Sequence, residues 1–120
     1  MDLKGNNGAY TSGGSQKKSL YGVEKGNRFV RRFRLFLRNG QVISIPYALL
    51  PIVILEADKS LRLKAHGLEV TVKGRSLHKV EEWLNEEKLL WLKEANTDMD
   101  DTEEYEVFIK SIEVEGDLML

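Results

Sequence analysis

The 120-residue chain contains no cysteine, only two prolines and only two histidines. Without cysteine it has no disulfide framework, thiolate nucleophile or Cys-ligated metal site, so it suits a reducing compartment and we expect a cytoplasmic protein. The histidines, His66 and His78, do not form a pair with metal-ligand spacing. We therefore expect no metal and no cofactor.

Long hydrophobic runs are also missing. The longest, residues 48–55, is interrupted by Pro51 and is far shorter than the roughly 20 residues that span a bilayer. No apolar run follows a basic start at the N-terminus, as it would in a signal peptide. We expect neither membrane insertion nor secretion, and a chain of this length predicts one domain with a single core.

Motifs of catalysis are absent from the sequence. Gly8 to Gly13 has the glycine spacing that begins a phosphate loop, but Gly14-Ser15 follows where Lys-Ser or Lys-Thr is needed. The acidic cluster is no calcium loop, because its sixth position needs glycine; its residues are Asp98, Asp100, Asp101, Glu103 and Glu104. We expect that the protein is not an enzyme.

What the chain does have is charge, unevenly distributed. Residues 1–40 carry nine Lys or Arg and two acids, whereas residues 76–120 carry four Lys or Arg and fourteen acids. Such asymmetry indicates either a basic binding segment with an acidic tail, or two oppositely charged regions that lie side by side in the fold.

The clearest structural pattern runs from Leu61 to Val72. Apolar and polar residues alternate on both sides of His66-Gly67, which is typical of two strands joined by a two-residue turn. This register pairs Ala65 with Leu68, Leu63 with Val70 and Leu61 with Val72 on the oily face. The opposite face pairs Lys64 with Glu69 and Arg62 with Thr71.

A second hairpin is predicted from Phe29 to Pro46, with a type I′ turn at Asn39-Gly40. That register places Leu37 opposite Val42, Leu35 opposite Ser44 and Phe33 opposite Pro46 on the core face. The outer face then pairs Phe36 with Ile43, Arg34 with Ile45 and Arg38 with Gln41. Pro46 cannot donate a ladder hydrogen bond, which places it on an edge strand or at a strand end.

The remaining elements follow from shorter signals. Residues 47–50 predict a turn or a single helical turn, and residues 52–56 predict a strand. Ser76 is a candidate N-cap for a helix over about 76–87, followed by a strand over 89–94; one helix continuing to Ala95 is the alternative. The last strand is expected over 105–115, with a bulge near Lys110-Ser111.

Together these elements predict an α+β domain, with a mostly antiparallel sheet of about five to seven strands and one short helix packed on one face. Residues 1–27 hold six of the ten glycines and no apolar period, which predicts a disordered N-terminal tail. The domain is expected over 28–116, with a C-terminal tail at 117–120.

Besides an enzyme of unknown type, for which the sequence offers no motif, two functions remain open. The first is a non-catalytic protein-interaction or accessory module, which forms a homodimer through the outer face of the first hairpin at Phe36, Ile43 and Ile45. The second is binding of RNA or single-stranded DNA by Arg32, Arg34 and Arg38, with the basic tail that precedes them.

The sequence favours the first function, because another strand could neutralise the positive charge of Arg32, Arg34 and Arg38. The last strand offers Glu106, Glu113 and Glu115. If the first and last strands paired, opposite charges across the sheet would neutralise the arginines without any nucleic acid.

Overall fold

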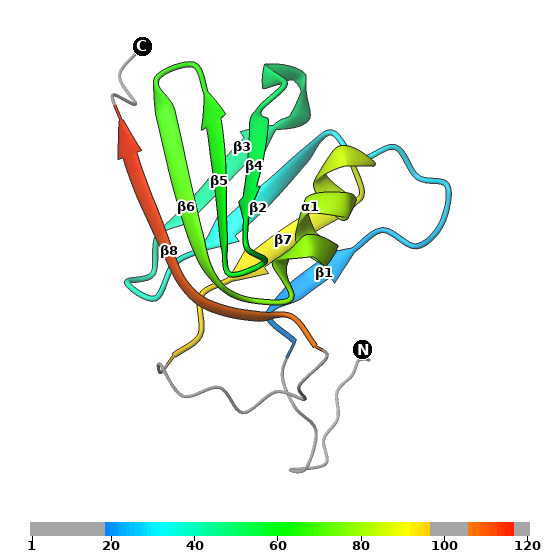
Figure 1. The fold of residues 1–120 in the computed structure, drawn as a ribbon. Coiled ribbons are helices and arrows are strands. Elements are labelled where there is room, and N and C mark those ends of the chain that lie inside the picture. The colour runs from blue at the N-terminus through cyan, green and yellow to red at the C-terminus, as the bar shows by residue number, and fades with distance from the viewer. Residues whose placement is uncertain (1–18, 97–105, 117–120) are drawn as a thin grey trace.

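The computed structural model describes residues 19–96 and 106–116, which form two four-stranded sheets and one α-helix (Figure 1). The first sheet has the strand order β1-β7-β2-β3; its strands are Tyr21–Val23, Leu89–Lys93, Arg32–Phe36 and Val42–Pro46. The second sheet has the order β4-β5-β6-β8; its strands are Ile52–Glu56, Ser60–Ala65, Leu68–Arg75 and Phe108–Gly116. A 3-10 helix, η1 (Tyr47–Leu49), joins the sheets, and the α-helix α1 is Leu77–Asn85.

The two sheets share one core, and α1 lies beside β4 (Figure 1). Leu35 and Leu92 of the first sheet and Leu61 and Val72 of the second are each 0% exposed within the same apolar cluster. The α+β class and the antiparallel pairing are confirmed, but a single sheet of five to seven strands is wrong. One nine-residue helix is too short to bury the apolar face of a sheet, so most of that face is buried by packing against the second sheet.

The hairpin of β5 and β6 is confirmed pair by pair, from Leu61 opposite Val72 to Ala65 opposite Leu68. His66 and Gly67 have φ of 49° and 83°, which is the positive φ that both central residues of a type I′ turn require. Local turn chemistry and hydrophobic alternation agree here, so the register was readable from the sequence.

The hairpin of β2 and β3 forms, but its predicted register is wrong by one residue. Phe33 pairs with Ile45 and Leu35 with Ile43. A one-residue slip turns every side chain of a strand to the other face. Ile43 and Ile45 therefore point into the core rather than outward.

The turn of this hairpin explains the slip. The Gly40 amide donates to the Leu37 carbonyl at 3.0 Å, and the Leu37 amide donates to the Gln41 carbonyl at 2.9 Å. The loop therefore has three residues, a tight turn followed by Gly40 at φ 94°, rather than the predicted two-residue turn. The Asn39 Oδ1 accepts from the Gln41 amide at 2.9 Å, which stabilises this form. Pro46 ends β3, the edge strand, as its missing amide predicts.

Helix α1 confirms the predicted helix, and the start of β7 at Leu89 excludes one helix continuing to Ala95. Ser76 precedes the helix, but its side chain makes no capping hydrogen bond. The cap comes from another element: Asp58, in the β4–β5 turn, accepts from the His78 amide at 2.5 Å.

Strand β8 confirms the predicted bulge. Lys73 pairs with Ser111 and Gly74 with Ile109, which leaves Lys110 without an opposite residue. A Cβ on Gly74 would lie 1.8 Å from the Phe108 carbonyl oxygen, so only glycine fits where the bulged strand approaches.

Strand β1 was missed by the sequence analysis, which assigned residues 1–27 to a disordered tail. Tyr21–Val23 pairs with β7 in the first sheet, so the folded domain begins before residue 28. Residues 1–18, the tail at 117–120 and the acidic cluster at 98–104 lie outside the described residues.

The predicted pairing of the first and last long strands is wrong. Strand β2 lies between β7 and β3 in the first sheet, whereas β8 pairs with β6 in the second. No helix among residues 19–96 and 106–116 is long and apolar enough to cross a membrane.

Candidate functional site

The outer face of the first sheet carries side chains in rows across the strands. Arg34 pairs with Ser44 of β3 on one side and with Trp91 of β7 on the other. The next row places Phe36 between Val42 of β3 and Lys93 of β7. We call this surface the basic face; its residues are Arg32, Arg34, Phe36, Val42, Ser44, Pro46, Trp91 and Lys93.

The basic face is positively charged. The four strands of the first sheet contain Arg32, Arg34 and Lys93 and no Asp or Glu, and all three cations are exposed. Within the described part of the chain none of the three forms an ion pair. Among the described residues, the one side-chain hydrogen bond of these cations is from Arg32 Nη1 to Ser44 Oγ, at 3.4 Å.

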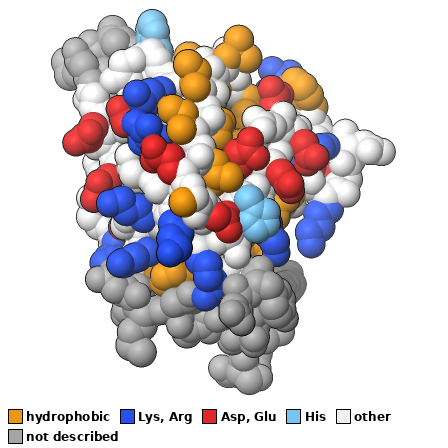
Figure 2. Space-filling view, viewed as in Figure 1, with side chains coloured by type: hydrophobic (Ala, Val, Ile, Leu, Met, Phe, Trp, Pro, Cys, Tyr) orange, Lys and Arg blue, Asp and Glu red, His pale blue; other side chains and the backbone are white. Residues whose placement is uncertain are grey.

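The outer face of the second sheet is different. Arg62 lies 3.3 Å from a Glu56 oxygen and 3.7 Å from a Glu69 oxygen. Figure 2 shows that on this side of the molecule Lys and Arg side chains are interspersed with Asp and Glu. Arg62 is therefore paired within the protein, and the strands of this sheet carry acids as well as cations, so the two sheets present surfaces of different electrostatic character.

Two aromatic side chains lie among the cations of the basic face. A Cβ on Gly22 would lie 2.2 Å from Trp91 Nε1, so the indole covers β1 where that strand has no side chain. Phe36 meets Trp91 edge to face, with ring centroids 6.0 Å apart at 86°. Both side chains are half-buried, so each ring retains exposed surface beside Arg34.

Arg38, a predicted binding residue, does not belong to this face. Its Nε donates to the Ala95 carbonyl at 2.8 Å and its Nη2 to the Lys110 carbonyl at 3.1 Å. Glu94 accepts from the Arg38 amide at 2.7 Å and from the Ile112 amide at 3.2 Å. Arg38 and Glu94 therefore connect the first hairpin and the end of β7 to β8.

The predicted dimer surface does not exist as one face. Ile45 is 2% exposed in the core, Ile43 packs against the same core, and Phe36 points to the opposite side of the sheet. Of the six predicted site residues, the structure places Arg32, Arg34 and Phe36 together, and it separates Arg38, Ile43 and Ile45 from them.

A pocket of about 320 Å³ adjoins the basic face where β2 begins and β3 ends. Arg32 and Pro46 belong both to the lining of the pocket and to the basic face. The pocket is lined by Phe29, Val30, Arg31, Arg32, Pro46, Tyr47, Ala48, Leu50 and Glu87. Phe29 and Leu50 are 78% and 77% exposed, and the Arg31 guanidinium lies 5.7 Å from the Phe29 ring centroid.

Tyr47, at the base of this pocket, is a structural residue. It is 5% exposed, and its hydroxyl donates to the Leu89 carbonyl at 2.8 Å. Burial raises the pKa of the phenol well above its ordinary value. The side chain therefore remains neutral and holds η1 against the start of β7.

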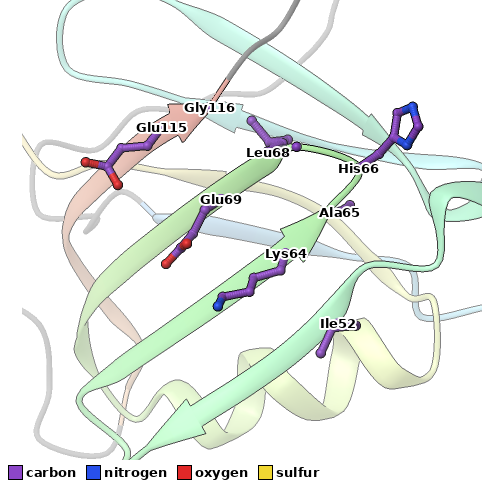
Figure 3. Close-up of a pocket in the computed structure, with 9 residues that line it drawn as sticks. Ile52, Lys64, Ala65, His66, Leu68, Glu69, Glu115 and Gly116 are labelled. Atoms are coloured by element: carbon purple, nitrogen blue, oxygen red, sulfur yellow. The ribbon is translucent and has the colours of Figure 1, made fainter. Parts of the chain in front are cut away.

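A second hollow, of about 440 Å³, lies at the turn end of β5 and β6 (Figure 3). Lys64 and Glu69 lie on neighbouring strands there, whereas His66 points away from the sheet at the turn (Figure 3). Its cation and carboxylates offset one another, and Glu69 is already paired with Arg62.

Sequence reasoning missed Trp91, Lys93 and Glu87 as site residues. Alternation in residues 89–94 places Trp91 and Lys93 on one side of a strand, but nothing local indicates that this strand lies parallel to β2. Among the described residues, no three His, Asp or Glu side chains are grouped so that they could hold a metal ion.

Comparisons of the chain with protein-family models, curated proteins and solved structures found no match.

Proposed function

We propose that this protein is a non-catalytic module that binds single-stranded nucleic acid, RNA or DNA, through the basic face. The observation that carries the proposal is the row of Trp91, Arg34 and Ser44, with Arg32 and Lys93 beside it, on a sheet whose strands contain no acid.

The chemistry of this surface suits an unpaired strand. Arginine and lysine bind phosphates, and exposed faces of aromatic rings stack on bases of any identity. Trp91 and Phe36 contact each other, and Arg34 is the strand neighbour of Trp91. Cations and stacking surfaces are therefore within one strand spacing of each other, which is about 4.8 Å.

Neutralisation of β2 by the last strand would account for the arginines without nucleic acid. In the structure Glu113 and Glu115 lie opposite Thr71 and Glu69 of the second sheet. These two glutamates therefore pair with residues of β6 and are not strand neighbours of Arg32 or Arg34. Pairing with the last strand therefore does not explain the arginines, which supports the proposal of an external polyanion.

A second candidate function is docking of another protein at the end of η1 and the residues that follow it. Leu49, Leu50 and Ile52 are 45%, 77% and 63% exposed, although all three are large apolar residues. Consecutive exposed apolar residues are typical of protein contact sites.

The direct test is fluorescence anisotropy with a labelled mixed-sequence oligonucleotide at low salt. We expect the double variant Arg32→Ala/Arg34→Ala to weaken binding by at least about tenfold, because it removes two phosphate contacts. The matched control is Lys64→Ala/Lys73→Ala, which removes the same charge from exposed residues of the second sheet. It should change affinity less than about threefold.

Two results would overturn the proposal. One is the absence of binding by the unmodified protein at low salt. The other is an equal loss in both double variants, which would show that only net charge matters.

A further inference from the structure

We propose that the pocket beside η1 receives one base of the bound strand, and that Glu87 selects a base with an exocyclic amino group. This inference deepens the proposed function and rests on it. It concerns the pocket of about 320 Å³ that Arg32 and Pro46 connect to the basic face.

The size and walls of the pocket suit a nucleoside. Its volume is at the lower end of the range for small-molecule sites, roughly 300–1,000 Å³. Phe29 is 78% exposed, which leaves a ring face for stacking, while Pro46 and Leu50 supply apolar walls. The Arg31 guanidinium lies 5.7 Å from the centroid of the Phe29 ring, a cation–π contact that places a positive charge beside the stacking surface.

The charges of the pocket do not neutralise one another. Arg31, Arg32 and Glu87 all line it, and no ion pair joins any of them to another described residue. Nor does the Glu87 side chain form a hydrogen bond within residues 19–96 and 106–116. A carboxylate in this setting lacks a donor, which a ligand can supply.

The sign of each charge indicates which part of a nucleotide it meets. A carboxylate repels phosphate, so the phosphates lie toward Arg31 and Arg32 and the base lies toward Glu87. Carboxylates accept hydrogen bonds from base amino groups, such as N4 of cytosine. Thymine and uracil present a carbonyl at that position, which leaves the carboxylate unpaired and costs affinity.

The experiment compares two oligonucleotides of equal length, oligo-dC and oligo-dT, which are both pyrimidine strands. The unmodified protein should bind oligo-dC about tenfold more tightly, as expected for one hydrogen bond to a charged acceptor. Glu87→Gln should abolish most of this preference, because the amide also donates to the thymine carbonyl. Glu82→Gln removes the same charge from an exposed residue of α1 outside the pocket, and it should keep the preference.

The outcomes separate this inference from the proposed function. Equal binding of both oligonucleotides, with loss in Arg32→Ala/Arg34→Ala, overturns the base pocket alone. A preference for oligo-dC that survives Glu87→Gln also overturns it. Absence of binding to either strand at low salt overturns the basic face as well. Free cytidine monophosphate should bind far more weakly than oligo-dC; equal affinity would overturn assignment of the pocket to a base within a strand.

Discussion

Arg34 and Arg38 lie in very different environments, although they are only four residues apart. Arg34 belongs to β2, and Arg38 belongs to the turn that follows. Arg34 is exposed and forms no ion pair among the described residues. Arg38 donates to two backbone carbonyls, one of them in the other sheet. Both looked alike as members of one basic strand, and only their tertiary contacts distinguish a candidate ligand from a structural residue.

Arg38→Ala should therefore destabilise the fold by roughly 1–3 kcal/mol, because it leaves the Ala95 and Lys110 carbonyls without their donor. Urea denaturation followed by circular dichroism measures the loss. Arg34→Ala is the matched control and should stay within about 0.5 kcal/mol of the unmodified protein. If Arg34→Ala were the more destabilising of the two, the assignment of their roles would be reversed.

Trp91 and Trp83 allow a second test at the level of single residues. Trp83 lies on α1 and stacks on Tyr21 at 5.0 Å, whereas Trp91 lies on the basic face. In a Trp83→Phe variant, the emission of the remaining indole should fall when oligo-dT is added, because a base stacks on it. Unchanged emission, under conditions where anisotropy shows binding, would place the strand elsewhere.

At the scale of elements, the start of α1 depends on a residue far from it in sequence. Asp58 has φ of 61° in the β4–β5 turn, which a short polar residue tolerates, and its carboxylate accepts from the His78 amide. The same carboxylate lies 3.0 Å from His78 Nδ1. One turn of the second sheet thus fixes both the position and the first hydrogen bond of the helix.

Asp58→Gly should lower the free energy of unfolding by about 1 kcal/mol, because it removes the cap while glycine retains the positive φ. Asp58→Asn is the control. Asparagine keeps an acceptor oxygen and tolerates the same backbone conformation, so this variant should lose less free energy of unfolding. Thermal denaturation of the two variants in parallel compares them. An equal loss in both would indicate that the charge on Asp58 matters more than the hydrogen bond.

At the scale of the whole molecule, the fold separates two kinds of surface that the sequence intermixes. The net charge is −1, which by itself favours no polyanion. The two-sheet fold places the strands that contain both acids and cations in one sheet and the acid-free strands in the other. A chain of net charge −1 therefore presents one locally positive face, and local potential rather than net charge directs association.

Salt dependence tests this view of the whole molecule. Each phosphate contact contributes about 0.7 to the slope of log K against log salt concentration for single strands. Arg32→Ala/Arg34→Ala should therefore reduce the slope by about 1.4, and Lys64→Ala/Lys73→Ala should leave it almost unchanged. A slope near zero for the unmodified protein would show that phosphates do not contribute to binding.

The sequence by itself determined the local structure wherever turn chemistry and hydrophobic alternation agreed. The hairpin at His66-Gly67, the helix after Ser76, the strand after it and the bulge at Lys110 were all indicated by patterns within a few residues. At Asn39-Gly40 two turns fit the same residues, and core packing of Ile43 and Ile45 selected the three-residue loop.

Only the tertiary structure decided which strands became neighbours. Parallel pairing of β2 with β7 joins residues nearly sixty positions apart, and no local signal encodes such a pairing because its stabilisation comes from shared burial. That pairing brings Trp91 and Lys93 beside Arg34 and Phe36. It also separates the arginines from the acids of β8, which is why the candidate site became visible in three dimensions and not in the sequence.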